Sequence, residues 1–408
     1  MKILFVHANY PAQFRNVAVA LAANPSNQVV FLSGNPKADP WQLPGVSHLP
    51  IKEPPQVNTS LHPWLQATDL AIRNGELAVR AMAQLKKLGF EPDLAISHAG
   101  TGYGLFIKDM FPKAKIVSYF EWFFRDHTLL DSFPEATQDE LVLWKRSNMT
   151  LLEELEACDL AVAPTRWQQE QLPAAYQKKI RIVFDGIATD FFHPSYFKSE
   201  LFLESLTSGI SLKIRPEHRL ITYATRGMEP IRGFPEFMRL VPQLLQHFKD
   251  ALVVIAGEDR SCYGPAAPSH RGSWKDKMLE ELKGELNDEQ SRIQFIGSLT
   301  YPQYRDLLCR SDLHCYFTRP YVPSWSLFEA AACGSRLLTN QGRATETIVT
   351  AGKLPAVDLD NPLEIRETAI DYLKAVNREE RQDRESFLPP RYSIGECMKR
   401  WNELLNAL

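Results

Sequence analysis

The sequence lacks several features that would place it in a specialised class of protein. Its six cysteines are scattered and form no Cys-x-x-Cys pair, so we expect neither a zinc site nor a disulfide framework, as in a cytosolic protein. No run of about 18 apolar residues occurs, so no transmembrane helix is expected, and the amino terminus MKILFVHANYP turns polar too early for a signal peptide. The net charge of -3 argues against general affinity for nucleic acid, although a local basic patch would still allow peripheral contact with a membrane.

Short apolar segments alternate with amphipathic segments along most of the 408 residues. Continuous apolar strands that alternate with helices indicate a parallel sheet covered on both faces. The rhythm breaks at residues 187–218, the best candidate for a linker, and then restarts, so we predict an α/β protein with two doubly wound halves. The expected strands are residues 2–8, 28–34, 92–98, 114–121, 159–165 and 179–186 in the first half, and 220–225, 251–258, 292–298, 313–318 and 336–340 in the second.

A basic turn follows the first expected strand of the second half. The strand LITYAT leads into RGMEPIRGF, which contains Arg226, Gly227 and Arg232. Ligands of open parallel sheets bind beyond the carboxyl ends of the strands, and guanidinium groups match phosphate oxygens. The turn is therefore a candidate phosphate site, and the alternative is a solvated basic turn.

A second candidate lies in FTRPYVPSWSLFEAAACGSRLLTNQG, residues 317–342. Ser324 fits a helix N-cap and Gly334 fits the C-cap, so the first-turn N–H groups at Ser324–Ser326 would attract an anion. Glu329 lies further along the same short helix, where a carboxylate could accept two hydroxyl groups of a ribose. Together with the two arginines, this arrangement predicts a nucleoside diphosphate site. The alternative for Glu329 is a partly exposed helix glutamate.

The order of these features resembles the retaining glycosyltransferases of family 4, which have the GT-B fold. The family's second half carries a Gly-Arg…Lys-Gly turn and a Glu-x7-Glu motif. Here the turn is TRGMEPIRGF, with Arg232 in place of Lys, and the second Glu is Glu329. The first Glu would fall at Tyr321, a departure at a position that lies near the donor sugar in the family. In the first half, PDLAISHAGTGYG resembles the strand that ends in a His, which gives His98, and KIRIVFDG carries Asp185 where Asn is usual.

The resemblance covers nearly the whole chain and implies a role for each part. Residues 1–190 would form a Rossmann-like acceptor domain and residues 191–388 a Rossmann-like nucleotide-sugar donor domain, with a helix in residues 389–408 that packs back on the first domain. The implied reaction is a metal-independent glycosyl transfer with retention, in polysaccharide biosynthesis. The sugar would move from a UDP-type or GDP-type donor to a glycan or lipid-linked acceptor, without a bound cofactor, in the cytoplasm or at the inner face of a membrane.

The resemblance and the residues together give three groups of candidate site residues. Catalysis would involve His98, Arg226 and Arg232. Donor binding would involve Gly227, Tyr321, Ser324, Trp325, Ser326 and Glu329. The acceptor side would include Gln13 and Phe14, which stand where many members have a Gly-rich loop, and Glu121 and Arg125 from SYFEWFFRDH. No metal ligands are expected, because the DLD motif at residues 358–360 fits a loop at a strand end.

Two other functions stay open at this point. Tyr321 in place of a glutamate would suit a catalytically silent paralogue that binds a sugar nucleotide or regulates a partner. A nucleotide-sugar epimerase on the same scaffold would need several carboxylates near the sugar, which the Tyr321 replacement makes less favourable.

Overall fold

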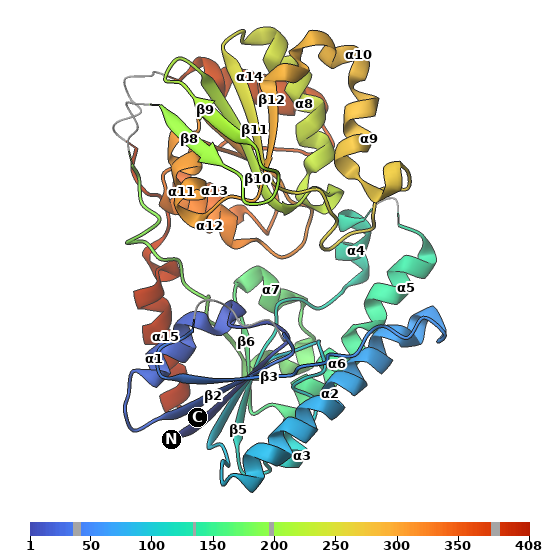
Figure 1. Ribbon diagram of the computed structural model, residues 1–408, viewed down its shortest axis with the longest axis vertical. Helices are drawn as coiled ribbons and strands as arrows, with labels where there is room; N and C mark the ends of the chain where they lie inside the picture. Colours follow the sequence, from blue (N-terminus) through green and yellow to red (C-terminus); the bar gives the residue numbers. More distant parts are fainter. Residues whose placement is uncertain (36–41, 134–135, 196–199, 377–383) are drawn as a thin grey trace. The chain divides into compact units, whose positions relative to one another are not determined.

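The computed structural model describes residues 1–35, 42–133, 136–195, 200–376 and 384–408. They form two compact units, each with its own parallel β-sheet (Figure 1). The first unit comprises residues 1–130, 134–186 and 391–408, and the second comprises residues 131–133 and 187–390. The two parallel α/β sheets expected from the sequence are therefore confirmed.

The first unit contains a seven-stranded sheet in the order β3-β2-β1-β4-β5-β6-β7, and all of its pairs are parallel. The strands are β1 (Lys2–His7), β2 (Gln28–Ser33), β3 (Val46–Pro50), β4 (Leu94–His98), β5 (Lys115–Tyr119), β6 (Leu160–Ala163) and β7 (Ile180–Ile182). The helices of this unit are η1 (Ala12–Phe14), α1 (Arg15–Ala22), α2 (Pro63–Lys87), α3 (Ile107–Met110), α5 (Gln138–Arg146), α6 (Asn148–Ala157), α7 (Arg166–Gln171), η2 (Ala174–Lys179) and α15 (Ile394–Asn406). Helix α4 (Asp126–Ser132) runs across the boundary between the residues of the two units.

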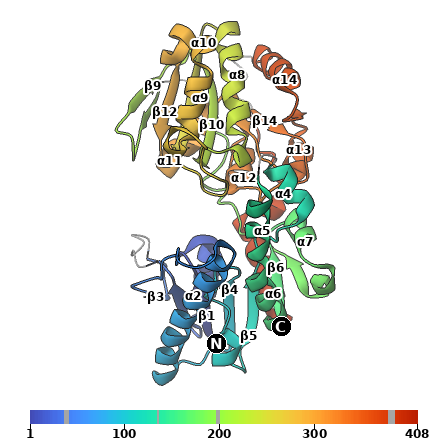
Figure 2. The same ribbon diagram turned by 90° about the vertical axis from the view of Figure 1, so that its right-hand side faces the viewer.

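Successive residues of β1 face opposite sides of this sheet, which explains why the strand is apolar throughout. Leu4 and Val6 pack in a core that includes Met82 of α2. Ile3 and Phe5 pack in a second core, which includes residues of α1 and α15. The helices seen on either side of the sheet in Figures 1 and 2 therefore cover both of its faces.

The second unit contains a six-stranded parallel sheet in the order β12-β11-β10-β13-β14-β15. The strands are β10 (Arg219–Gly227), β11 (Ala251–Glu258), β12 (Ile293–Gly297), β13 (Leu313–Tyr316), β14 (Leu337–Asn340) and β15 (Ala356–Val357). The helices are η3 (Pro230–Arg232), α8 (Phe234–His247), η4 (His270–Gly272), α9 (Trp274–Glu281), α10 (Lys283–Leu286), η5 (Asn287–Arg292), α11 (Tyr301–Arg310), α12 (Trp325–Ala332), α13 (Glu346–Gly352), α14 (Pro362–Lys374) and η7 (Pro390–Tyr392), the last lying where the two units' residues meet in the chain.

The stretch at residues 187–218, expected as a linker, contains structure that the sequence did not reveal. Strands β8 (Leu201–Glu204) and β9 (Ser211–Ile214) pair antiparallel. Leu201 and Leu203 are buried and share a core with residues of β10 and β11. The expected linker is therefore wrong over these strands, because the alternating burial of β8 joins it to the second unit.

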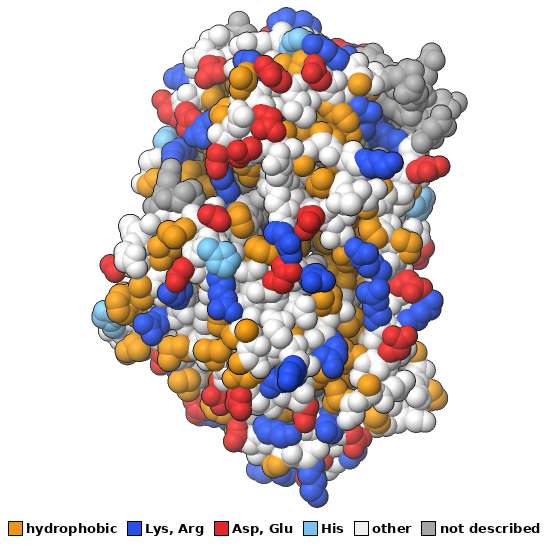
Figure 3. Space-filling view, turned by 180° about the vertical axis from the view of Figure 1, so that it is seen from behind, with side chains coloured by type: hydrophobic (Ala, Val, Ile, Leu, Met, Phe, Trp, Pro, Cys, Tyr) orange, Lys and Arg blue, Asp and Glu red, His pale blue; other side chains and the backbone are white. Residues whose placement is uncertain are grey.

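The mixture of charges on the surface and the polarity of the helices match what the composition predicts. Figure 3 shows basic and acidic side chains interspersed over one face of the molecule, in keeping with the small net charge of -3. Among the residues that the structure describes, no helix has both the length and the apolar character needed to cross a bilayer.

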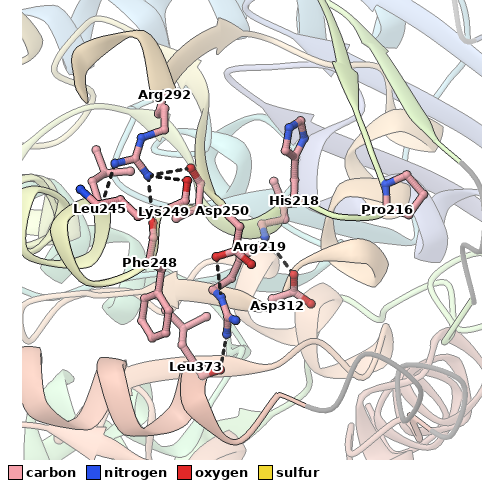
Figure 4. Close-up of polar contacts among 12 residues, drawn as sticks. Pro216, His218, Arg219, Leu245, Phe248, Lys249, Asp250, Arg292, Asp312 and Leu373 are labelled. Carbon is pink, nitrogen blue, oxygen red and sulfur yellow. Dashed lines mark hydrogen bonds and ion pairs between the residues drawn. The ribbon is translucent and has the colours of Figure 1, made fainter. Parts of the chain in front are cut away.

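Arginine side chains close the amino ends of the strands in the second unit. Arg292 donates to the main-chain oxygens of Leu245 and Phe248 at 2.7 and 2.9 Å, and Arg219 binds Asp250 and the Leu373 carbonyl (Figure 4). These groups satisfy carbonyls that end the neighbouring helices. The carboxyl ends of the strands lie at the opposite edge of the sheet, which is where open parallel sheets generally bind their ligands.

A third arginine, Arg310 on α11, is more deeply buried than Arg219 and Arg292. Its guanidinium pairs with Asp312 at 3.1 Å, and both side chains are almost fully buried. It also donates to the carbonyl of His218 at 2.8 Å, while Asp312 accepts from the Leu220 amide at 2.9 Å. The pair therefore joins the turn before β10 to the start of β13.

Replacing Arg310 with Met should strongly destabilise the second unit, because Asp312 would remain buried without its cation. We expect the free energy of unfolding to fall by about 3–5 kcal/mol, measured from urea denaturation. The matched control is Arg80→Met, which removes an exposed pair with Glu76 on α2 and should change stability by less than about 1 kcal/mol. Equal small losses in both variants would contradict a structural role for the Arg310–Asp312 pair.

Candidate active site

The first candidate site lies at the carboxyl ends of the strands of the second unit and is centred on Arg232. This side chain is only 6% exposed. Its Nη1 donates to the Thr318 hydroxyl at 3.1 Å and to the Val322 carbonyl at 2.8 Å. The rings of Tyr263 and Tyr321 lie 5.0 and 5.9 Å from the guanidinium carbon. The cation is thus fixed in place by groups from two segments of the chain, residues 318–322 and the loop that carries Tyr263.

Backbone geometry places Arg232 where it is. Arg232 ends the short helix η3, and Gly233 follows with φ at +65°. A Cβ atom at Gly233 would lie 2.3 Å from Cβ of Phe317, so only glycine fits this close approach. The glycine in the motif IRGF therefore lets the arginine turn pack directly against the segment that follows β13.

Glu229 is a residue of this site that the sequence analysis missed. It is fully buried, and its Oε2 accepts from the main-chain N–H groups of Cys262, Tyr263 and Gly264 at 3.1, 3.0 and 2.8 Å. The Glu229 carbonyl also accepts from the Arg232 amide at 3.1 Å. Glu229 therefore holds the loop that carries Tyr263 against the turn that carries Arg232, but only the fold brings these segments together.

Arg226 and Gly227 lie at the end of β10, beside the same loop. Arg226 is exposed, in contrast to the buried Arg232. Gly227 is buried, and a Cβ atom there would lie 2.5 Å from the Arg260 carbonyl oxygen. The two arginines that the sequence grouped together therefore differ in environment, with one fixed by the protein and the other open to solvent.

Helix α12 begins at Trp325, as the sequence predicted, with Ser324 at the N-cap position. The side chain of Ser324 does not cap the helix, however, which corrects the expected capping bond. Its hydroxyl instead pairs with the Ser326 hydroxyl at 2.5 Å, and its amide donates to the Tyr316 hydroxyl at 3.0 Å. Trp325 is exposed and Ser326 is half-buried. Gly334 follows the helix with φ at +63°, as expected for a helix end.

Glu329 lies on the buried face of α12 and is only 7% exposed. The alternative of a partly exposed helix glutamate is therefore wrong. Burial raises the pKa of its carboxyl to about 7, against an opposing effect of Tyr304. A buried acid of this kind is poised to gain hydrogen-bond donors, such as hydroxyl groups of a ligand.

A second cluster of polar side chains lies at the carboxyl ends of β1, β4 and β5 in the first unit. It brings together Gln13, His98 and Glu121, three of the residues predicted from the sequence. Gln13 donates to Glu121 at 2.6 Å, and Nε2 of His98 lies 3.7 Å from Oε2 of Glu121. His7, which the sequence analysis did not single out, bonds to Gln13 at 2.9 Å.

The charges in this cluster are strongly coupled. Burial alone would lower the pKa of His98, but the interactions with Glu121, supported by Glu154 and Asp185, raise it above the ordinary histidine value. Burial would likewise raise the pKa of Glu121, yet His98 and Gln13 hold it below its ordinary value. The two shifts favour an ion pair between Glu121 and His98.

The remaining acceptor-side candidates have different surroundings. Phe14 is buried in the hydrophobic core and packs edge-on against His7 and Tyr119. Arg125 donates to the Gln171 carbonyl at 2.7 Å and lies over the ring of Phe123. The structure thus joins Phe14 to the cluster through packing, whereas Arg125 contacts the last residue of α7.

Glu154, on α6, is a further buried acid that the sequence analysis missed. Its Oε2 accepts from the Gly100 amide at 2.5 Å, and Gly104 leaves the space that its Oε1 occupies, since a Cβ atom there would lie 2.5 Å from that oxygen. Burial raises the pKa of Glu154 to about 7, although the Gly100 bond and His98 oppose the shift. Glu154 therefore holds the loop that follows His98.

Neither cluster has the composition of a metal site. Among residues 1–35, 42–133, 136–195, 200–376 and 384–408, no group of three or more His, Cys, Asp and Glu side chains could hold a metal ion. Asp360, from the DLD motif, instead pairs with Arg319 at 2.8 Å.

Comparisons with known proteins agree with these features. Residues 25–192 match the glycosyl transferase family 4 group, and residues 239–385 match a glycosyl transferase-like family. These two matches together span most of the chain, which confirms the resemblance to family 4 glycosyltransferases found in the sequence. A Saccharomyces cerevisiae relative, the GPI3 subunit of phosphatidylinositol N-acetylglucosaminyltransferase, is 23% identical over 148 residues. The match covers 36% of this chain and 29% of the relative, so the chain spans less than a third of that protein.

Solved structures with similar folds cover nearly the whole chain. The Anabaena protein Alr3699/HepE in complex with UDP and glucose aligns with a TM-score of 0.63 at 13% identity, over all of both chains. An E. coli trehalose-6-phosphate structure bound with UDP-2-fluoro glucose aligns with a TM-score of 0.66 at 11% identity, over 100% of this chain and 99% of that one. A putative UDP-N-acetylglucosamine 2-epimerase from Listeria monocytogenes gives 0.58 at 15% identity, over 100% and 96%. The predicted GT-B fold is confirmed.

Replacing Glu154 with Gln should change how stability depends on pH. Because folding raises the pKa of Glu154 to about 7, its contribution to stability is present at acidic pH and is lost as the pH rises through 7. The free energy of unfolding of Glu154→Gln, taken relative to that of the wild type, should therefore increase by about 1–3 kcal/mol as the pH rises from 5 to 8.

Chemical denaturation at several pH values measures this difference. The control is Glu153→Gln at the exposed neighbouring position on α6, whose difference from the wild type should stay flat with pH. A flat difference for Glu154→Gln as well would show that the buried carboxyl does not titrate in this range.

Proposed function

We propose that this chain transfers a sugar from a nucleotide-diphosphate donor of the UDP or GDP type to a glycan or lipid-linked acceptor, with retention and without a metal ion. The observation that carries the proposal is the buried Arg232, held by Thr318 and Val322 beside the start of α12. A fixed, buried cation at a helix amino terminus suits a diphosphate. The match of residues 25–192 to the glycosyl transferase family 4 group supports this class of reaction.

In the proposed reaction, the bond between the anomeric carbon and the β-phosphate oxygen breaks, and a bond from that carbon to an acceptor hydroxyl forms. Negative charge develops on the leaving diphosphate, which would take up the proton that the acceptor hydroxyl loses. Arg232, Arg226 and the first-turn amides of α12 would stabilise the leaving group as fixed electrostatic groups. Gly227, Tyr321, Trp325 and Ser326 would line the donor, and Glu329 would accept the ribose hydroxyls.

The first unit would supply the acceptor side and the remaining catalytic group. His98 would contact the reacting sugar, and Glu121 and Gln13 would orient it. Arg125 completes the proposed acceptor side, and the buried Phe14 would support it only from the core, by packing against His7. The proposed setting is polysaccharide biosynthesis in the cytoplasm, with peripheral contact at the inner face of a membrane as one route to a lipid-linked acceptor.

The proposal is tested by measuring release of nucleoside diphosphate from a panel of UDP- and GDP-sugars, with and without candidate acceptors. Arg232→Ala should lower turnover by about 10²–10³-fold, the usual effect of losing one such charge-stabilising group. The matched control is Arg239→Ala, which removes a surface arginine paired with Glu281 on the same unit and should leave turnover unchanged.

A near wild-type rate for Arg232→Ala would reject the phosphate role. Donor binding by thermal shift without any turnover would instead favour a catalytically silent paralogue. Interconversion of two nucleotide sugars without transfer would identify an epimerase.

Glu329 should give nucleotide binding a characteristic pH dependence. The carboxyl titrates near pH 7 in the free protein, and only its ionised form accepts two hydroxyl groups. The affinity for the nucleoside diphosphate chosen by the panel should therefore fall as the pH drops from 8 to 6. In Glu329→Gln the affinity should be weaker at pH 8, and this dependence should be lost. Calorimetric titration of the nucleotide measures both effects, and the same pH dependence in the two proteins would remove Glu329 from the ribose site.

A further inference from the structure

The polar cluster of the first unit forms a continuous chain of four side chains: His7, Gln13, Glu121 and His98. His7 ends β1, His98 ends β4, and Glu121 follows β5, so the three meet at one edge of the sheet. Gln13 comes from η1, the short helix after β1. We name this set the His7–His98 chain.

The hydrogen bonds at one end of the chain fix which nitrogen of His7 carries a proton. Nδ1 of His7 lies 2.7 Å from the main-chain amide of Asn9. An amide N–H can only donate, so Nδ1 must be an acceptor and Nε2 must carry the ring proton. Nε2 then donates to Oε1 of Gln13 at 2.9 Å. His7 is therefore neutral, in agreement with a pKa that burial lowers to about 3, with a smaller contribution from His98.

This bond fixes the orientation of the Gln13 amide. With its oxygen turned to His7, Gln13 presents its NH₂ group to Oε1 of Glu121, at 2.6 Å. The first oxygen of the Glu121 carboxylate is thereby occupied. The second oxygen, Oε2, faces His98.

The geometry around His98 fixes a proton on Nδ1 and favours a second proton on Nε2. Nδ1 lies 3.1 Å from the Ala99 carbonyl, which can only accept, so Nδ1 carries a proton. Nε2 lies 3.7 Å from Oε2 of Glu121. With a bare Nε2, its lone pair would face the carboxylate oxygen, whereas a protonated Nε2 makes an ion pair with Glu121, whose side chain is partly exposed.

The close packing of the two imidazoles favours a positive charge on only one of them. The ring centroids of His7 and His98 are 4.5 Å apart, so two positive rings would repel strongly. His7 is kept neutral by Asn9, and the charge therefore belongs on His98. The other groups facing His98 favour the same state, because Glu154 and Asp185 are acidic, while the Tyr119 hydroxyl donates to Asp185 at 2.5 Å.

We propose that His7 is a positioning residue that acts through Gln13 to fix the Glu121 carboxylate. We propose further that the His7–His98 chain keeps His98 doubly protonated. His98 would then serve the proposed transfer as a fixed positive charge and hydrogen-bond donor rather than as a general base. Its role in the reaction rests on the proposed function, but its charge in the free protein does not.

The test is nuclear magnetic resonance of the free protein with ¹⁵N-labelled histidine, with signals assigned from His7→Gln and His98→Gln. At pH 7, both ring nitrogens of His98 should be protonated, and His7 should show a protonated Nε2 and a bare Nδ1. In His7→Phe, which keeps a stacking ring without the Nε2–H donor, the titration midpoint of His98 should fall by about one pH unit.

The matched control is His48→Phe. His48 lies on β3 and bonds to Ser33, outside the His7–His98 chain, so this variant should leave the His98 midpoint unchanged. If His7→Phe does not fold, Gln13→Met breaks the same chain at its second link and should give the same direction of shift. In an active preparation, either variant of the chain should lower kcat by about tenfold with little change in the donor KM.

A neutral His98 at pH 7 in the wild type would overturn the proposal. An unchanged midpoint in the folded His7→Phe and Gln13→Met variants would overturn it as well. Failure to find any glycosyl transfer would reject the proposed function, but it would leave the measured charge of His98 intact, so the two failures are distinguishable.

Discussion

A charge that is buried before any substrate arrives must be matched by groups that the fold itself supplies. Arg232 meets this constraint through the oxygens of Thr318 and Val322. Thr318 is in turn held by Asn340, whose side-chain amide bonds to both its main-chain N–H and its carbonyl, at 2.8 and 2.9 Å. The position of one guanidinium thus depends on the ends of β13 and β14 and on the turn after β10. This chain of support makes the proposed phosphate site rigid.

In both units, polar and charged side chains gather at the carboxyl ends of the strands. In the second unit, Arg310 and Asp312 close the amino ends with a buried pair, while Arg232 and Glu329 lie toward the carboxyl ends. In the first unit, the carboxyl ends of β1 and β4 carry His7 and His98. Parallel sheets favour this arrangement, because all of their strands end at one edge. Charged side chains can therefore be concentrated there without disturbing the apolar cores.

Sequence patterns predicted the parts of this protein that depend on local order. The apolar strands, the start of α12 at Trp325 and the end of the helix before Gly334 follow from residues close in the chain. Buried partners from distant segments were missed, because Glu229 binds a loop some 33 residues further along and Glu154 binds Gly100 from a helix 54 residues away. The occurrence of Arg226 and Arg232 in one short turn of the sequence also did not show that one side chain is exposed and the other buried. The spacing of residues in the sequence identifies candidate charged groups, whereas their burial in the fold determines their pKa and their bonding partners.

Helix α15 gives the first unit a discontinuous chain. Trp401 and Leu404 share a core with residues of β1 and α1, although all of the second unit lies between them in the sequence. During synthesis on a ribosome, the second unit emerges whole before that core can be completed. The first unit would then wait with an exposed apolar face on β1 and α1 until residues 391–408 appear. The core that α15 shares with β1 and α1 would therefore be completed only after the whole second unit has been synthesised.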